Sequence, residues 1–197
     1  MRFPRLCAVL AKPAIPLVAL LVFAGSCSAQ GFFKKPEVNI FVGYSLQRYD
    51  ASPYGFGGTQ NLNGGNLEIS LPDLYRGLGV VGDFSGHWND EIKTFNFTGG
   101  PQYRFEVKGI DFFGHALFGK SRSRLLKLGT SQIEPSSLGG TAALGGGADI
   151  PFGKRFAFRA IQADYLINSA FGVRHYDMRY SSGLVIVFGK RSAPPSF

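Results

Sequence analysis

The sequence predicts an all-β fold, an eight-stranded antiparallel up-and-down transmembrane β-barrel preceded by a cleavable signal peptide. Three observations predict it. Eight runs alternate in polarity, the connections between them alternate in length, and the composition combines 27 Gly, 19 Phe and 8 Tyr with only 17% charged residues. Such a composition favours strands and turns over helices. The eight runs are Glu37–Arg48, Gln60–Leu71, Gly77–Trp88, Lys93–Glu106, Ile110–Lys120, Leu138–Pro151, Arg155–Ile167 and Asp177–Arg191.

The first 29 residues read as a secretory signal peptide. A basic start with Arg2, Arg5 and Lys12 precedes an apolar run, Ala14–Ala24, which is too short for a comfortable membrane span. Cleavage is expected after Ala29. Without the three leader cations the formal net charge falls from +8 to +5. Residues 30–36 then form a periplasmic lead-in, 37–190 the barrel and 191–197 a short tail.

Both cysteines, Cys7 and Cys27, lie in this leader. The mature chain therefore has no thiol, which excludes cysteine nucleophiles, thiolate metal sites and disulfides. An alternative makes Cys27 the lipidated first residue of a lipoprotein, although the usual Leu three positions before it is missing. A domain of this size without disulfides needs another source of stability, which a closed barrel supplies.

The first four runs have an apolar face opposite a polar or small face, as strands with one lipid-facing side require. Pro72 and Asp73 are expected to turn the chain after the second run. The fourth run alternates most clearly. Its Pro101 cannot donate to a strand ladder, so a bulge or a locally broken pair is expected there.

The last four runs contain the exceptions. The fifth is followed by the longest predicted irregular stretch, Ser121–Ser137, with room for a short helix or a hairpin extension. The sixth is rich in Gly, which leaves space in a narrow interior. In the seventh, alternation places Phe158 and Ala160 inward and Arg159 outward, towards lipid. A bulge near Arg159, or snorkelling to the headgroups, would resolve that conflict.

The connections distinguish a membrane barrel from a soluble sandwich. In chain order they are predicted to be long, short, medium, short, very long, short and long. Outer-membrane barrels have short periplasmic turns and longer external loops. With the N-terminus in the periplasm, every odd connection lies outside, and here all four odd connections are predicted to be the longer ones. A soluble sandwich has no reason to follow this rule.

Aromatic and aliphatic side chains mark the lipid-facing side and both interfaces. Two girdles of aromatics are typical of such barrels, although aromatic residues also simply favour strands. The residues expected to face lipid or the interfaces are Trp88, Tyr103, Phe105, Tyr165, Tyr180, Leu184, Ile186 and Phe188.

On these features the chain resembles the small eight-stranded OmpA-like outer-membrane barrels. The resemblance covers roughly Pro36 to Lys190 and is carried by the leader, the alternating runs, QADYL at 162–166 and GLVIVFGKR at 183–191. It implies insertion by the barrel-assembly machinery, which reads an aromatic residue at the end of the last strand. Phe188 fits that role, while two prolines in the tail argue against Phe197.

The inward faces carry polar residues that eight strands can enclose only as a packed interior. Charges there must pair or meet water. The favoured interpretation is a rigid plug of ion pairs and hydrogen bonds, and the alternative is a narrow ion-conducting pore. The expected lumen residues are Glu37, Asn39, Glu68, Asp83, His87, Arg104, Glu106, Asp111, His115, Asp149, Gln162 and Asp164.

No motif indicates catalysis, a cofactor or a metal. The three histidines at 87, 115 and 175 lack ligand spacing, and His175 does not stand in the His-x-Ser arrangement of the lipid-deacylating barrels. The Gly-rich stretches 55–58 and 145–147 lack the strand-to-helix context of a phosphate loop. The sequence therefore predicts no enzyme.

The predicted function is a structural or surface-interaction barrel in the outer membrane of a Gram-negative-type bacterium, displaying extracellular loops. One alternative is a pore for ions or small solutes. A less favoured alternative is a lipocalin-like carrier, because the outer wall of such a soluble barrel should be polar, whereas the outer faces predicted here are apolar. Expected partners are outer-membrane lipids, lipopolysaccharide, the assembly machinery and an unidentified extracellular ligand, with no nucleic acid and a monomeric state. A basic cluster expected in one loop, Lys120, Arg122, Arg124 and Lys127, suits lipid headgroups but also fits a solvated loop.

Overall fold

The computed structural model describes residues 37–50, 52, 58–125, 136–170, 172–189 and 191 of the chain. Several predictions fall outside the described residues and stay predictions. They concern the signal peptide with Cys27, the lead-in, Lys127 and the tail beyond residue 191. No described helix is long and apolar enough to span a membrane.

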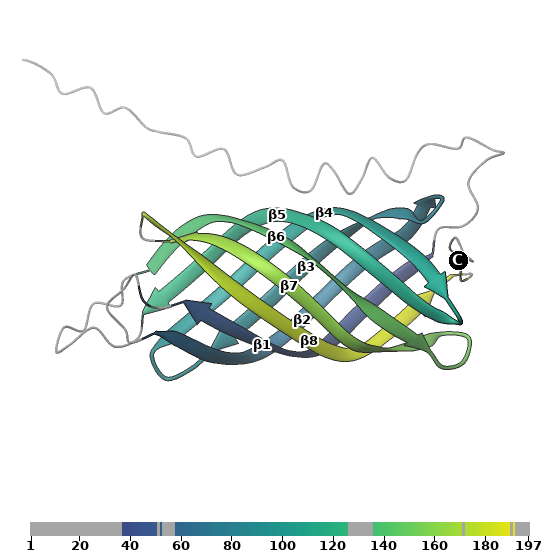
Figure 1. The fold of residues 1–197 in the computed structure, drawn as a ribbon, viewed down its shortest axis with the longest axis horizontal. Helices are drawn as coiled ribbons and strands as arrows, with labels where there is room; N and C mark the ends of the chain where they lie inside the picture. Colours follow the sequence, from purple (N-terminus) through teal and green to yellow (C-terminus); the bar gives the residue numbers. More distant parts are fainter. Residues whose placement is uncertain are drawn as a thin grey trace, which may run out of the picture. The chain divides into compact units, whose positions relative to one another are not determined.

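Eight antiparallel strands close into one barrel, as the sequence predicts (Figure 1). Each strand pairs with its neighbours in chain order, and β8 returns to β1 through a ladder from Val38↔Phe188 to Arg48↔Met178. Closure leaves no free sheet edge. The strands are β1 (Val38–Asp50), β2 (Thr59–Tyr75), β3 (Leu78–Trp88), β4 (Ile92–Val107), β5 (Ile110–Leu125), β6 (Ser136–Pro151), β7 (Phe156–Ala170) and β8 (Val173–Phe188).

Two turns at one end of the barrel have two residues each. Lys108 and Gly109 both have positive φ, as the tight turn predicted there requires. The turn expected at Pro72 and Asp73 is misplaced, because β2 continues to Tyr75 and the chain turns at Arg76-Gly77, with φ of 48° and 84°. The β2–β3 ladder shifts register between Leu71 and Tyr75, which accommodates the proline within the strand.

Strands replace predicted loops at the opposite end. β5 runs on to Leu125 and β6 already begins at Ser136, so residues 121–125 and 136–137 of the predicted irregular stretch belong to extended strands of the β5–β6 hairpin. The predicted loop 168–175 is also wrong, because β7 and β8 leave only residues 171 and 172 between them. The last odd connection is therefore not longer than the even ones. The inward-facing residues at this end are polar because they face the charged interior. A polar stretch of sequence is usually predicted to be a loop.

Pro101 breaks one ladder locally without a bulge. It pairs with Val80 on β3, but the β4–β5 ladder passes from Gly99↔Phe118 to Gln102↔His115 without a pair at residues 100 and 101. The register is the same on both sides of the gap. Of the two outcomes expected for this proline, the structure shows the locally broken pair.

A β-bulge in β7 resolves the conflict at Arg159. The ladders to both β6 and β8 shift register between residues 159 and 162, so β7 carries one extra residue. Ala160 and Ile161 consequently both face outward, and Arg159 is turned inward and buried. The predicted inward placement of Phe158 and Ala160 is wrong for the same reason: both are exposed on the outer wall.

Candidate functional site

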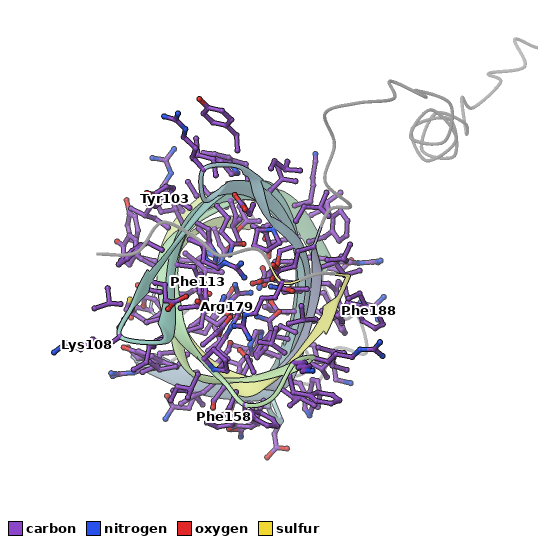
Figure 2. All side chains as sticks on the ribbon, turned by 90° about the vertical axis from the view of Figure 1, so that its right-hand side faces the viewer. Tyr103, Lys108, Phe113, Phe158, Arg179 and Phe188 are labelled. Atoms are coloured by element: carbon purple, nitrogen blue, oxygen red, sulfur yellow. The ribbon has the colours of Figure 1, made fainter. Side chains whose placement is uncertain are left out.

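The candidate site is the charged interior of the barrel. Viewed along the barrel, Arg179 and Phe113 project inward, while Tyr103, Phe158 and Phe188 project outward (Figure 2). Ten of the residues expected in the lumen have exposed fractions of 6% or less: Glu37, Asn39, Glu68, Asp83, His87, Arg104, Asp111, His115, Gln162 and Asp164. Asp149 is also buried, and Glu106 is half-buried near the end of β4.

Arg179, from β8, is one centre of this interior. Its Nη1 donates to Asp83 Oδ1 on β3 at 2.7 Å, and its Nη2 donates to Asp164 Oδ2 on β7 at 2.7 Å. Nη1 also donates to Ser85 Oγ at 2.8 Å. The guanidinium is thus neutralised by two carboxylates from different strands, which ties three strands together across the lumen.

Arg159, placed inward by the bulge, is the second centre. Its Nε donates to Asp149 Oδ1 at 2.8 Å and its Nη1 donates to Glu68 Oε2 at 3.1 Å. Its guanidinium carbon lies 4.3 Å from the ring centroid of Phe41 and 4.2 Å from that of Phe113. Two aromatic faces and two carboxylates therefore enclose one buried cation.

The two centres belong to one network. Gln162 accepts from Arg159 Nη1 at 2.6 Å and donates through Nε2 to Asp164 Oδ2 at 2.9 Å. His115 Nε2 lies 2.8 Å from the other oxygen of Asp164. The Gly-rich part of β6 makes room for this network, because a Cβ at Gly145 would collide with the Asp164 carboxylate.

A further ionic group lies at the end of the barrel that carries the Arg76-Gly77 and Lys108-Gly109 turns. Arg104 donates to both oxygens of Glu37, at 2.8 and 3.2 Å, in a two-pronged arrangement. Asp111 lies 4.0 Å from Arg104 and also forms an ion pair with Arg191. Residue 191, assigned to the tail, is therefore joined to the barrel.

The opposite end has a polar group around Asp177. Its carboxylate accepts from Gln47 Nε2 at 3.0 Å, from Asn168 Nδ2 at 2.6 Å and from the backbone amide of Asp50 at 2.9 Å. The rings of Tyr49 and His175 pack beside it with centroids 4.7 Å apart. Fully buried Leu62 and Ile92 also face inward in this part of the barrel.

One pair in the interior has the spacing of a base and a nucleophile. His87 Nε2 lies 2.8 Å from Ser45 Oγ, which in turn accepts from Ser181 at 2.8 Å. His87 and Ser45 are both fully buried, and His87 Nδ1 has no hydrogen-bond partner among the described residues to orient the ring. The pair lacks the third group and the access that covalent catalysis uses. No cluster of metal-binding side chains occurs in the described part of the chain.

The outer wall presents the side chains expected to face lipid. Trp88, Tyr103, Tyr165, Leu184 and Phe188 are exposed, and Phe105, Tyr180 and Ile186 are partly exposed on the same side. Aromatic rings stack in pairs on this wall, with centroids 6.0 Å apart for Tyr165 and Tyr176 and 6.2 Å apart for Tyr103 and Phe105. This apolar exterior around a charged interior is the inverse of a soluble barrel.

Several interior residues were missing from the sequence prediction. Extending the alternation of β8 backward from Ser181 places Arg179, Asp177 and His175 on the inner face, where they are buried. The alternation of β8 therefore carries the signal for these three residues. Arg159 could be found only by recognising that a charge on an apolar face implies a bulge.

Solved structures share this architecture. The Neisserial surface protein A (NspA) matches with a TM-score of 0.60 and 14% identity, covering 77% of this chain and 97% of that one. Ail, the attachment invasion locus protein of Yersinia pestis, matches with a TM-score of 0.54 and 20% identity, covering 79% and 100%. Ail in complex with the heparin analogue sucrose octasulfate gives 0.56 and 18%, covering 79% and 100%. No protein-family model and no curated protein sequence matches the chain.

The fold is therefore that of the small eight-stranded, OmpA-like outer-membrane β-barrels, as the resemblance of the sequence implied. At these identities the likeness concerns the fold. The charged interior and the outer wall of this chain have to be interpreted from its own residues.

Proposed function

We propose that this protein is exported, inserted into the outer membrane of a Gram-negative-type bacterium, and serves there as a structural or surface-interaction barrel with a closed lumen. The apolar outer wall and the closed sheet support insertion, because a lipid-exposed strand must have every backbone group paired. The leader, residues 1–29, supports export. A lipocalin-like carrier is not favoured, since its outer wall would be polar.

The observation that carries the closed lumen is the network joining Arg159 and Arg179. Each guanidinium is held by two carboxylates, and both side chains are fully buried. An eight-stranded barrel has an interior only wide enough for side chains. Ion passage would require both charge groups to separate in a medium of low dielectric constant, which is costly.

Recording single channels in planar bilayers tests this closed state. The wild-type barrel is expected to give no discrete conductance steps. The double variant Arg159→Ala/Arg179→Ala is expected to give measurable leak, because it removes the two guanidinium groups at the centres of the lumen network. Discrete steps from the wild-type protein would contradict the plug.

A narrow pore is the second candidate, and one observation favours it. Several buried polar atoms have no hydrogen-bond partner among the described residues, including Asn66 Nδ2 and Oδ1, Asn96 Oδ1, Ser121 Oγ and Thr141 Oγ1. Such atoms are normally satisfied by water, so a narrow pore would have to supply water to them and continue past Arg179.

The location has its own test. Expression in a Gram-negative host followed by membrane fractionation is expected to place the protein in the outer membrane, with gel migration that changes on heating. Recovery of a soluble periplasmic protein would contradict the proposal. We assign no catalytic step, no cofactor and no metal to the barrel, and take a monomer as the working state.

The external partners are proposed at the level of chemistry. Ail was solved with a sulfated heparin analogue, a polyanion. Without the three cations of the leader, this chain still carries a formal net charge of +5. Anionic lipids, lipopolysaccharide and an anionic extracellular ligand are therefore the partners that its charge suits best.

A further inference from the structure

A row of cations stands on the outer wall of the β5 extension. Lys120, Arg122 and Arg124 alternate with buried serines, so all three project outward and are exposed. Across the β4–β5 ladder, Lys93 is also exposed and lies directly opposite Arg124. We call these four residues the basic stripe. The sequence placed three of them in a loop, but they belong to rigid strands.

The basic stripe has no ion-pair partner among the described residues. None of its four cations appears in a salt bridge, and the residues beside it on β6 are Ser136, Leu138 and Gly140. The acids closest in sequence, Asp90 and Glu91, lie in the β3–β4 connection. Like charges directly opposite on one face of an antiparallel pair destabilise it. An anion bound between Lys93 and Arg124 would reverse the sign of that interaction.

Aromatic side chains connect the stripe with an apolar groove. Arg122 pairs across the ladder with Phe95, and Lys120 pairs with Phe97; both rings are exposed. Phe95 also lines a groove of about 340 Å³ on the outer wall of β1–β4. Its other walls include Leu67 and Trp88, and three glycines contribute to its lining: Gly43, Gly65 and Gly86.

The juxtaposition matches an amphiphile with a phosphorylated head and acyl chains. The cations suit phosphate groups, and the groove beside them, lower on the wall, suits a hydrocarbon chain. We propose that the basic stripe and this groove together bind a phosphorylated glycolipid of the outer leaflet, with phosphates on Lys93, Arg122 and Arg124 and an acyl chain over Gly65. The proposal rests on the proposed insertion, which sets the β5–β6 hairpin on the outer side.

A soluble sulfated or phosphorylated glycan is the competing occupant, and the groove argues against it. Such a ligand would use the cations but would have no use for an apolar channel next to them. The two occupants therefore differ in their dependence on Gly65. A Cβ at Gly65 has only the Gly43 carbonyl oxygen nearby, at 3.7 Å, so the backbone has room for a side chain there, and Gly65→Val is expected to fill part of the groove. Gly82→Val is the matched control, since Gly82 is exposed on β3 outside the groove and its nearest atom is 4.0 Å away.

The experiment uses the full-length protein isolated from membranes and reconstituted in phosphatidylcholine nanodiscs, titrated with diphosphoryl lipid A. Lys93→Gln/Arg122→Gln/Arg124→Gln should weaken lipid A binding by about tenfold or more, and added salt should weaken binding by the wild type. The control variant Lys108→Gln/Lys154→Gln/Arg155→Gln removes the same charge at the other end and should bind as the wild type does. Gly65→Val should weaken binding by about fivefold, and Gly82→Val should not.

Trp88 supplies a second readout that needs no variant, because it is the only Trp of the chain and lines the groove. Lipid A with a spin-labelled acyl chain should quench its fluorescence more strongly than spin-labelled phosphatidylcholine does. Equal quenching, or equal affinity of the wild type and the stripe variant, would overturn the proposal. Displacement by sucrose octasulfate together with no effect of Gly65→Val would assign the stripe to a soluble polyanion instead. Failure of the barrel to reach the membrane would show separately, as loss of heat-modifiable migration.

Discussion

At the scale of single residues, two arginines in the lumen depend strongly on specific carboxylate partners. Arg179 and Arg159 are both fully buried and each has two carboxylate partners. A buried pair of this kind adds little net stability compared with a well-packed apolar set of the same volume. Removal of one partner is much more damaging, since the remaining charge has no compensation.

Arg179→Ala is therefore expected to lower the free energy of unfolding by about 3–5 kcal/mol. The loss follows from leaving Asp83 and Asp164 buried without their shared cation. Urea unfolding of the barrel in lipid vesicles, followed by heat-modifiable migration, measures it. Arg174→Ala is the control on the same strand, where the side chain is exposed, and should stay within about 0.5 kcal/mol of the wild type.

The same residues predict a strong departure from additivity. Replacing the group as a whole, with Asp83→Asn, Asp164→Asn and Arg179→Met, removes the uncompensated charges together with the cation. This triple variant is expected to unfold at a higher urea concentration than Arg179→Ala alone, because neutral side chains are cheaper to bury. A triple variant less stable than the single one would show that the carboxylates contribute through other contacts.

At the scale of elements, the bulge in β7 turns the side chain of an arginine into the lumen. A regular strand would alternate without interruption and place Arg159 in lipid. The extra residue instead turns Arg159 inward, and Ser182 Oγ on β8 donates to the Arg159 carbonyl oxygen at 3.0 Å. A hydroxyl from the neighbouring strand thus contacts the backbone at the start of the bulge.

Ser182→Ala should lower the free energy of unfolding by about 0.5–1.5 kcal/mol, the net contribution of one hydrogen bond. The same unfolding assay measures the change. Ser169→Ala, an exposed serine at the outer end of β7, serves as the matched control and should have little effect. An equal response of the two variants would mean that the Ser182 hydroxyl does not support the bulge.

The closing strand carries the prediction about assembly. Phe188 is the last residue of β8, projects outward and pairs with Val38 of β1 (Figure 2). Phe188→Ala should reduce the amount of heat-modifiable barrel in the outer membrane more than deletion of residues 192–197 does. Quantitative blotting of membrane fractions compares the two variants. A stronger effect of the tail deletion would move the assembly signal to the C-terminus.

At the scale of the whole molecule, the sequence predicts the barrel well because period-two alternation is a global property. One face of every strand must meet lipid, so Val42, Phe97 and Leu184 could be placed outward from the pattern alone. What alternation cannot show is where the pattern is interrupted. The bulge at residues 160–161 depends on Arg159 finding carboxylates from β2 and β6, which is a tertiary effect.

The ends of several strands were also predicted wrongly, for a related reason. Ser121, Ser123, Asn168 and His175 read as loop residues because they are polar, yet all four are buried on inner faces. A polar stretch in a soluble protein indicates a loop, but in this barrel it indicates the lumen. For Ser121 and Ser123, the alternation with exposed Arg122 and Arg124 distinguishes an inward-facing strand from a loop.

The partners in the lumen network are far apart along the chain. Arg179 is 96 residues from Asp83, and Arg159 is 91 residues from Glu68. These contacts join early strands, β2 and β3, to late strands, β7 and β8, so they are expected to form late in folding. An opening of the barrel that separates these strands also breaks them. We therefore expect both folding and unfolding to be slow. A high activation barrier to unfolding would then keep the protein folded in its membrane.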